Sequence, residues 1–442
     1  MNPKIIVDPP GPKSKILIER EQNSVSHVHA HYLPIAIKRG YDNMVEDVDG
    51  NTYLDLTAGA AVMGVGYKRK EVVDSINKQM QNILAHSIFF ATFEPHIQLA
   101  EKIKELIPFN TLKNSRISFG ASGSEAVEMA LSLTRTKKLS IISLFPSYHG
   151  RTLATNSLTG MKSSFRKNLV PLSSGVIHAP YPDSYRNPFG LNDFDAHDAA
   201  ANYVENLLTT LVPPEDVGAI IMEPIGGSGG YQVPSNSYMK RIKKLCKDND
   251  ILFIADEVQT GFGRTGKMFG MEHFDIEPDM MTIGKVLGGG LPIGALVANE
   301  KLMQNWKPGD WGSTFGGNLL SMTAGLSTLE IIQKEKLDKN AEIRGKQLMD
   351  GLKDLMKKNN IIGDVRGKGL MLAFELVKDR KTKVPATDEA RALVNLCMKS
   401  GLLVSTCGTY GSTVRLLPPL TLSENEAGIS LDLITKSINH IS

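Results

Sequence analysis

The chain has 442 residues, enough for two or three domains. Hydrophobic residues make up 41% of it and charged residues 22%, the usual balance of a globular protein in water. The formal net charge of +3 is spread along the chain without a block of lysines and arginines, which argues against a nucleic-acid partner. No stretch reaches the roughly 18 to 20 apolar residues of a membrane span, and the N-terminus lacks the apolar run of a signal peptide.

Three cysteines, Cys246, Cys397 and Cys407, lie far apart, with no CxxC pair and no neighbouring pair of histidines. This spacing fits neither a disulfide framework nor a zinc site, and it favours a reducing compartment. We therefore expect a cytoplasmic protein that has no metal centre and no contact with a membrane.

Strand and helix patterns alternate through the middle of the chain, after two strands near the N-terminus. Near the N-terminus, residues 44–47 and 53–56 are predicted strands joined by a turn at 49–51. Further along, helical patterns such as 125–134 and 238–247 separate apolar, β-branched runs. These predicted strands are 116–119, 140–145, 217–222, 251–255, 281–284 and 295–298. Several runs are apolar throughout, which is typical of strands buried on both faces of a parallel sheet, so we expect a doubly wound α/β domain.

Near residue 330 the pattern changes to long amphipathic helices. The predicted elements of this C-terminal part are helices at 318–333, 337–358, 388–399 and 424–438 and strands at 370–376 and 413–417. We expect the N-terminal strands to pack with them in a smaller α+β domain. The predicted domains are a large α/β domain over 63–330 and a small domain built from 1–62 and 331–442.

Two glycine patterns suggest other enzyme classes. Residues 261–266 (GFGRTG) match the dinucleotide fingerprint GxGxxG, which should leave a strand directly and open a helix. Here residues 257–260 intervene and no good helix start follows, so an NAD-dependent dehydrogenase is only a remote alternative. Residues 226–230 (GGSGG) match the GxSxG elbow of hydrolases, but no helix is predicted after them, which favours a flexible glycine loop.

A phosphate site is predicted where the strand at 116–119 runs into the helix at 125–134. Ser122 and Glu125 stand in the S-x-x-E relation of a capping box. The flanking glycines, Gly120 and Gly123, allow a ligand to approach the backbone, and a helix N-terminus offers unpaired N–H groups to an anion. The two interpretations are compatible.

Asp256 and Lys285 each end an apolar strand pattern. A carboxylate against a sheet core needs a cationic partner, and ligands in such sheets lie at the carboxyl ends of strands. A lysine that is partly removed from water has a lowered pKa, which frees its amine for Schiff-base chemistry. With the phosphate site near Gly123, these groups match the needs of pyridoxal phosphate.

The motifs together resemble the class III (subgroup II) aminotransferases, a branch of the fold-type-I pyridoxal-phosphate enzymes. The resemblance runs from about Asp47 to Ile434 and is closest to the 4-aminobutyrate aminotransferases. The motifs that carry it are SGSEA at 122–126, SYHGRT at 147–152, EP at 223–224, DEVQTGFGRTG at 256–266, Lys285, STFGGN at 313–318 and Arg415.

The resemblance implies a role for each matching residue around the cofactor. Lys285 would form the internal aldimine and move the Cα proton, and Asp256 would keep the pyridine nitrogen protonated. The cofactor's other contacts would be Gly123 and Ser124 at the phosphate, Tyr148 stacked on the ring with His149 beside it, and Val258 and Gln259, the latter at the ring hydroxyl. Thr314 would reach the phosphate of a neighbouring subunit, which implies a homodimer or a dimer of dimers.

For the substrate, the resemblance implies that Arg415 binds a carboxylate, with Glu223 and Ser228 also near the substrate. Many 4-aminobutyrate and ornithine enzymes have a glutamate where this chain has Ser228. That glutamate is thought to pair with the arginine when the donor lacks an α-carboxylate, so Ser228 favours donors that have one.

Other reactions of the same family remain open. Amino-acid racemases and epimerases begin with the same proton removal, and residues 180–186 (PYPDSYR) resemble a stretch of isoleucine epimerase. Dialkylglycine decarboxylase has a serine at the position of Ser228, but it also uses a glutamine near the position of Ala60, which argues against decarboxylation. We expect an aminotransferase that passes an amino group from an amino acid to a keto acid such as 2-oxoglutarate.

Overall fold

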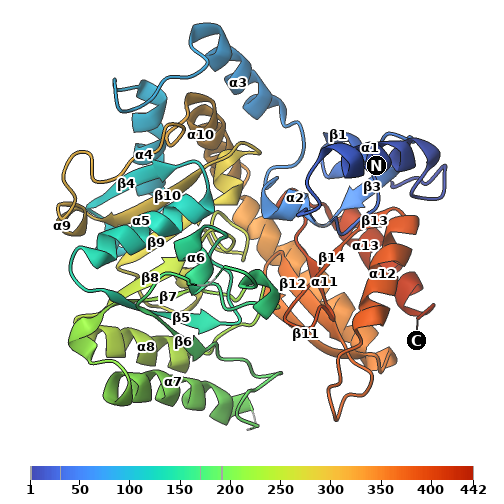
Figure 1. Cartoon of the computed structure of the whole chain (residues 1–442). Helices are drawn as coiled ribbons and strands as arrows, with labels where there is room; N and C mark the ends of the chain where they lie inside the picture. Colours follow the sequence, from blue (N-terminus) through green and yellow to red (C-terminus); the bar gives the residue numbers. More distant parts are fainter. Residues whose placement is uncertain (1, 30, 170, 191–192, 442) are drawn as a thin grey trace. The chain divides into compact units, whose positions relative to one another are not determined.

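The computed structural model describes residues 2–29, 31–169, 171–190 and 193–441 (Figure 1). The chain divides into two compact units. One consists of residues 71–338, and the other combines residues 1–70 with 339–442. The units are described separately below.

A seven-stranded sheet forms the centre of the larger unit, in the order β4-β10-β9-β8-β7-β5-β6. Its strands are β4 (Ser115–Gly120), β5 (Ser140–Phe145), β6 (Val176–Pro180), β7 (Val217–Met222), β8 (Leu252–Asp256), β9 (Met280–Gly284) and β10 (Gly294–Asn299). Neighbours from β6 to β9 are parallel, whereas β10 is antiparallel to both β4 and β9. Every residue of β7 and β9 is buried, as expected for strands covered on both faces.

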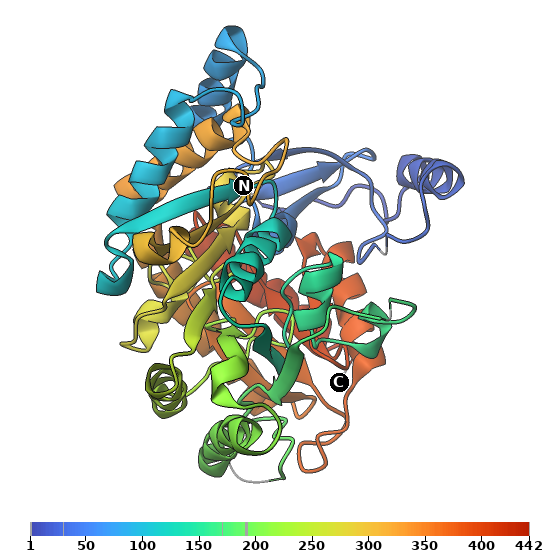
Figure 2. The ribbon, with the colours of Figure 1, turned by 60° about the vertical axis from the view of Figure 1, so that its left-hand side comes forward.

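Helices lie on both sides of this sheet (Figure 2). They are α3 (Lys70–Asn82), α4 (Glu94–Leu106), α5 (Gly123–Arg135), α6 (Leu153–Leu158), α7 (Asp193–Thr210), α8 (Asn236–Asp248), α9 (Glu300–Met303) and α10 (Leu319–Lys334). Helix α5 packs across several strands, and α10 packs on α4. This is the doubly wound arrangement predicted from the alternating pattern, which is confirmed.

Local hydrogen bonds explain why α5 begins where it does. The backbone N–H of Glu125 donates to Ser122 Oγ at 3.1 Å, and Glu125 Oε2 accepts from the backbone N–H of Ala121 at 2.7 Å. These bonds satisfy backbone donors that a helix N-terminus leaves unpaired. On the buried side of the helix, Ala126 and Ala130 let it lie close to the sheet.

Two four-stranded sheets form the smaller unit, in the orders β1-β2-β3-β13 and β11-β12-β15-β14. Their strands are β1 (Ile37–Tyr41), β2 (Met44–Asp47), β3 (Thr52–Asp55), β11 (Ile362–Lys368), β12 (Met371–Leu376), β13 (Leu402–Leu403), β14 (Ser405–Cys407) and β15 (Thr413–Leu416). The unit's helices are α1 (Pro12–Ser24), α2 (Ala58–Ala61), α11 (Leu337–Lys358), α12 (Thr387–Lys399) and α13 (Glu424–Ile438). Strand β13 pairs in parallel with β3, so strands from both ends of the chain share one sheet.

Some features of the fold were not predicted from the sequence. Strand β6 contains His178 and ends at Pro180, so its sequence does not show an apolar run. Strand β10 was predicted as a strand, but its antiparallel direction relative to β4 and β9 was not predicted. Residues 261–266, with their GxGxxG pattern, form turns followed by a short 3-10 helix at Gly270–His273, which is not the strand-to-helix crossover of a dinucleotide site.

Candidate active site

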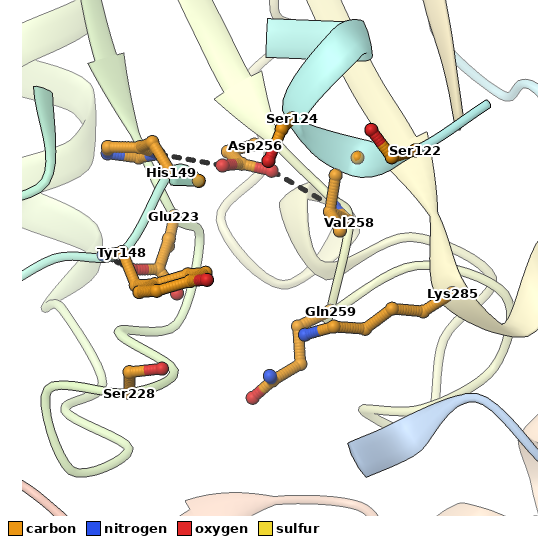
Figure 3. A pocket seen from close by; sticks show the side chains of 12 residues that line it. Ser122, Ser124, Tyr148, His149, Glu223, Ser228, Asp256, Val258, Gln259 and Lys285 are labelled. Carbon is orange, nitrogen blue, oxygen red and sulfur yellow. Dashed lines mark hydrogen bonds and ion pairs between the residues drawn. The ribbon is translucent and has the colours of Figure 1, made fainter. Parts of the chain in front are cut away.

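A cavity of about 170 Å³ lies in the larger unit at the carboxyl ends of its parallel strands (Figure 3). It is lined by Ser122, Gly123, Ser124, Tyr148, His149, Gly150, Glu223, Ser228, Asp256, Val258, Gln259 and Lys285. The structure thus brings together ten of the twelve residues named as site residues from the sequence. The other two, Thr314 and Arg415, do not line this cavity.

The N-terminus of α5 forms one wall of the cavity. A side chain at position 123 would be crowded, since a Cβ atom there would stand 2.8 Å from Val258 Cγ1. Gly294, on the neighbouring β10, is packed more closely still, since its Cβ would stand 2.0 Å from the carbonyl oxygen of Ser122. Glycines at these two positions leave the first backbone N–H groups of α5 available to an anion.

Asp256 ends β8 and is 4% exposed. Its Oδ2 lies 2.6 Å from Nδ1 of His149, while Oδ1 accepts from the hydroxyl of Thr282 at 2.9 Å and from the backbone N–H of Val258 at 3.2 Å. A charged carboxylate can only accept a hydrogen bond, so Nδ1 of His149 is the donor in this contact. Burial lowers the pKa of His149, but the hydrogen bond and the charge of Asp256 outweigh it, so its pKa is raised above the ordinary value.

Thr282 was not singled out in the sequence. It lies directly opposite Asp256 in the register of β8 and β9. The signal that could have found it is the one hydroxyl in the apolar run MMTIG at 280–284.

Glu223 is buried and lies next to Tyr148 in the cavity wall (Figure 3). Its Oε1 accepts the backbone N–H of Tyr148 at 2.9 Å, and its Oε2 accepts the backbone N–H of Gly227 at 2.7 Å. Burial is the main cause of the raised pKa of this carboxyl group. The side chain therefore ties two cavity loops together, and a direct contact of Glu223 with substrate stays a prediction.

Lys285 follows β9 and opens a short 3-10 helix, Lys285–Gly288. Its backbone has a left-handed φ of 49°, a conformation that is uncommon for residues other than glycine and that gathers at functional sites. Figure 3 shows its side chain extending through the cavity toward Gln259, with Tyr148 on the facing wall. Gln259 Oε1 is buried and has no hydrogen-bond partner among the described residues.

The two remaining site residues lie elsewhere. Thr314 is exposed in the segment before α10, next to Phe315, which is 63% exposed. Arg415 belongs to β15 in the smaller unit, where its Nε donates to Ser405 Oγ at 2.9 Å.

Comparison with known proteins shows the family. The model of the family described as aminotransferase class-III matches residues 25–438. This chain belongs to the class III aminotransferase family. Enzymes of this family depend on pyridoxal phosphate, and the chain is accordingly a pyridoxal-phosphate-dependent aminotransferase by family.

Individual relatives in this class III family carry different activities in their names. An alanine/serine racemase of Pyrococcus horikoshii is 36% identical over 99% of this chain and 92% of its own length. A 4-aminobutyrate aminotransferase of Mycobacterium leprae is 34% identical over 98% of this chain and 97% of its own. The crystal structure of the omega transaminase from Pseudomonas jessenii in complex with PMP superposes with a TM-score of 0.90 at 29% identity, covering 96% and 97% of the two chains.

The cavity suits the family's cofactor in its chemistry. The N-terminus of α5, where glycines at 123 and 294 avoid close contacts that a side chain would make, suits a phosphate. The buried carboxylate of Asp256 at a strand end suits a protonated ring nitrogen. The amide oxygen of Gln259 has no hydrogen-bond partner among the described residues. It is therefore a group that the cofactor's ring can hydrogen-bond to. The dehydrogenase alternative has no support from the turns at 261–266 or from the family.

The close packing of Gly294 against Ser122 predicts that a side chain at position 294 weakens cofactor binding at the N-terminus of α5. Gly294→Ala would push the Ser122 carbonyl away from β10 and displace the first turn of α5, so we expect at least a tenfold loss of pyridoxal-phosphate affinity, about 1.4 kcal/mol. Fluorescence titration of the apo-protein measures it. Gly428→Ala in α13 is the matched control, because nothing lies within 4 Å of its Cβ position. Equal affinities for the two variants would contradict the crowding argument.

Proposed function

We propose that this enzyme moves the amino group of an α-amino acid to a keto acid, with Lys285 as the residue that carries the proton. The observation that supports it is the convergence of Lys285, Asp256 and the α5 N-terminus on one small, largely buried cavity. For the acceptor, the family resemblance suggests 2-oxoglutarate.

Each residue has a proposed task in this reaction. When bound, pyridoxal phosphate supplies an electron sink for the charge left at the substrate's Cα. The amine of Lys285 takes the Cα proton and returns it to another atom. Asp256 stabilises a proton on the ring nitrogen, and His149 keeps this carboxylate in place through the 2.6 Å contact. Tyr148, fixed by Glu223, would lie against the ring face, and Gly123 and Ser124 would hold the phosphate through their backbone.

Two further contacts are proposed from residues of the same cavity, and a third, at Arg415, is proposed from the family resemblance. The side chain of Val258 lies close to Gly123, because a Cβ atom at position 123 would touch it. Val258 would therefore pack against the cofactor's ring next to the phosphate site. Gln259 would donate to or accept from the ring hydroxyl. Arg415 would bind the substrate carboxylate with the two parallel hydrogen bonds that a guanidinium allows.

The role of Lys285 gives the primary test. The purified protein should be yellow with pyridoxal phosphate, and borohydride reduction should attach the cofactor covalently to Lys285. Peptide mapping by mass spectrometry locates the adduct. In Lys285→Ala we expect no adduct and a loss of activity of about a hundredfold to ten-thousandfold, since proton transfer by a positioned base contributes about 10² to 10⁴. A colourless protein that takes up no pyridoxal phosphate would sink the proposal.

The choice of amino donor follows from Ser228. By the family resemblance, a glutamate at this position would pair with the arginine at 415 when the donor lacks an α-carboxylate. This chain has an uncharged serine instead, so α-amino acids should react faster than 4-aminobutyrate. We expect Ser228→Glu to shift the ratio of kcat/KM toward 4-aminobutyrate by about tenfold, or 1.4 kcal/mol. Ser228→Gln is the control, because glutamine has nearly the size of glutamate but carries no charge. A native preference for 4-aminobutyrate refutes the donor assignment.

Racemisation is the second candidate, favoured by the similarity to the Pyrococcus horikoshii alanine/serine racemase. Both reactions begin with removal of the Cα proton and differ in the atom that receives it. Single L-amino acids incubated with the enzyme and no keto acid, followed by chiral chromatography, separate the two. If the enzyme is an aminotransferase, the D-isomer should form far more slowly than the enzyme transaminates the same amino acid in a separate assay with a keto acid. If the D-isomer forms at a comparable rate without a keto acid, racemisation replaces aminotransfer as the proposed function.

We also propose a homodimer in which Thr314 contributes to the partner's phosphate site. In support, large apolar side chains are exposed on the larger unit around α3, α4 and the segment before α10: Met80, Ile83, Leu84, Phe89, Phe90, Ile97 and Phe315. Phe89 and Gly312 are in close contact, which joins the two exposed segments. Exposed apolar side chains that gather on one part of a protein mark protein–protein contact sites.

The place of the enzyme in the cell is a separate proposal. We propose the cytoplasm, because the buried thiols Cys246, Cys397 and Cys407 fit a reducing compartment. None of the helices in the described ranges is long and apolar enough to cross a membrane.

A further inference from the structure

The glycine loop at 226–230 places Ser228 in the wall of the active-site cavity (Figure 3). Its sequence favours flexibility, but the structure buries all four of its glycines and leaves Ser228 partly exposed. The backbone N–H of Gly230 donates to the carbonyl oxygen of Gly227 at 3.1 Å. This bond closes a tight turn in which Ser228 is the second residue. The loop is therefore an ordered turn that presents one polar side chain to the cavity.

Both neighbours of Ser228 in this turn are held by side chains. The backbone N–H of Gly227 donates to Oε2 of Glu223 at 2.7 Å. The carbonyl oxygen of Gly229 accepts from Nε2 of Gln232 at 2.8 Å. Breaking either bond would leave a buried polar group without its partner, which is costly. The backbone of Ser228 is therefore fixed from both sides.

Gln232 follows the loop and holds it at two points. Its backbone carbonyl oxygen accepts from the N–H of Gly226 at 2.9 Å, at the base of the loop, and its side chain reaches Gly229. The same Nε2 also donates to Oδ2 of Asp183 at 3.2 Å. Both partners of Nε2 are acceptors, so only one orientation of the side-chain amide satisfies them. Gln232 is 4% exposed, and water cannot easily replace these bonds.

Asp183 connects this glutamine to a different part of the unit. It lies in the stretch PYPDSYR at 180–186, whose residues do not line the active-site cavity. Its Oδ1 accepts the backbone N–H groups of Tyr185 and Arg186 at 2.9 and 2.8 Å, while Oδ2 accepts from Gln232. Asp183 therefore ties the turn after β6 to the residue that holds the glycine loop.

We propose that Gln232 and Asp183 are positioning residues that influence the choice of amino donor by fixing the place of Ser228. The proposal rests on the proposed function, in which Ser228 favours an α-amino acid over 4-aminobutyrate. Neither Gln232 nor Asp183 is among the residues that line the cavity, so both act through the loop. A side chain can select between two donors only if its place is fixed to within about 0.5 Å, and here the fixing comes from outside the wall.

Hydrogen exchange, followed by mass spectrometry on the cofactor-loaded enzyme, measures how firmly residues 226–232 are held. Gln232→Met keeps the length of the side chain but removes both donations, so we expect these amides to exchange about tenfold faster than in the native enzyme. Asn249→Leu is the matched control, since it removes an amide donation to the carbonyl oxygen of Leu245, 2.9 Å away, at the end of α8. Equal exchange of the loop in the two variants would overturn the proposal.

Asp183→Asn tests the second positioning residue and is the milder change. The side chain keeps its size and one oxygen for the two backbone N–H groups that it binds, but it no longer offers Gln232 an acceptor on its other side. Because the bond from Gln232 to Gly229 stays, we expect residues 226–232 to exchange about threefold faster than in the native enzyme. Native exchange rates in this variant would contradict the role of Asp183.

A change at Ser228 in two backgrounds tests the effect on the donor, which a merely structural role would not alter. Ser228→Glu should shift the ratio of kcat/KM toward 4-aminobutyrate about tenfold in the native enzyme, but less than about threefold in Gln232→Met, where the loop no longer holds the side chain in place. A full shift in both backgrounds, with borohydride trapping at Lys285 intact, refutes the positioning proposal alone. No shift in the native enzyme refutes the donor assignment, and failed trapping refutes the proposed function.

Discussion

The constraint on which the rest of the active site depends is the burial of one carboxylate, Asp256, at the end of a strand. Removing a charge from water costs several kcal/mol unless hydrogen bonds and a partner charge compensate. Here the compensation comes from His149, Thr282 and the backbone of Val258. Those partners belong to the loop after β5, to β9 and to the loop after β8. Satisfying a single side chain therefore fixes three neighbouring segments of the cavity relative to one another.

A second buried carboxylate extends the same logic to the opposite wall. Glu223 accepts the N–H groups of Tyr148 and Gly227, so the loop that carries the aromatic ring and the glycine loop that carries Ser228 are held by one side chain. Buried networks of this kind are rigid when every member is satisfied. Rigidity is what a site needs if a lysine amine is to meet one particular proton of a bound substrate.

The residue types of the site could be predicted from the sequence because strand ends and helix starts leave local marks. Asp256 and Lys285 each close an apolar run, and Ser122 and Glu125 form a capping pair, so their convergence at one sheet edge follows from the fold. The contacts could not be predicted in this way. His149 and Asp256 are 107 residues apart, and the crowding of Gly294 against Ser122 depends on the antiparallel register of β10 and β4. Register and loop packing are set by non-local contacts, which periodicity does not encode.

The parallel pairing of β3 with β13 has a consequence for how the protein is made. Leu54 and Leu402 are neighbours in one sheet although nearly the whole chain lies between them. The larger unit, residues 71–338, is contiguous and leaves the ribosome complete while β13, one of the two partners of β3, is still untranslated. The three N-terminal strands can pair with one another, but their sheet lacks its fourth strand until β13 emerges. During translation the cavity around Lys285 can form early, whereas the smaller unit is completed only at the end of synthesis.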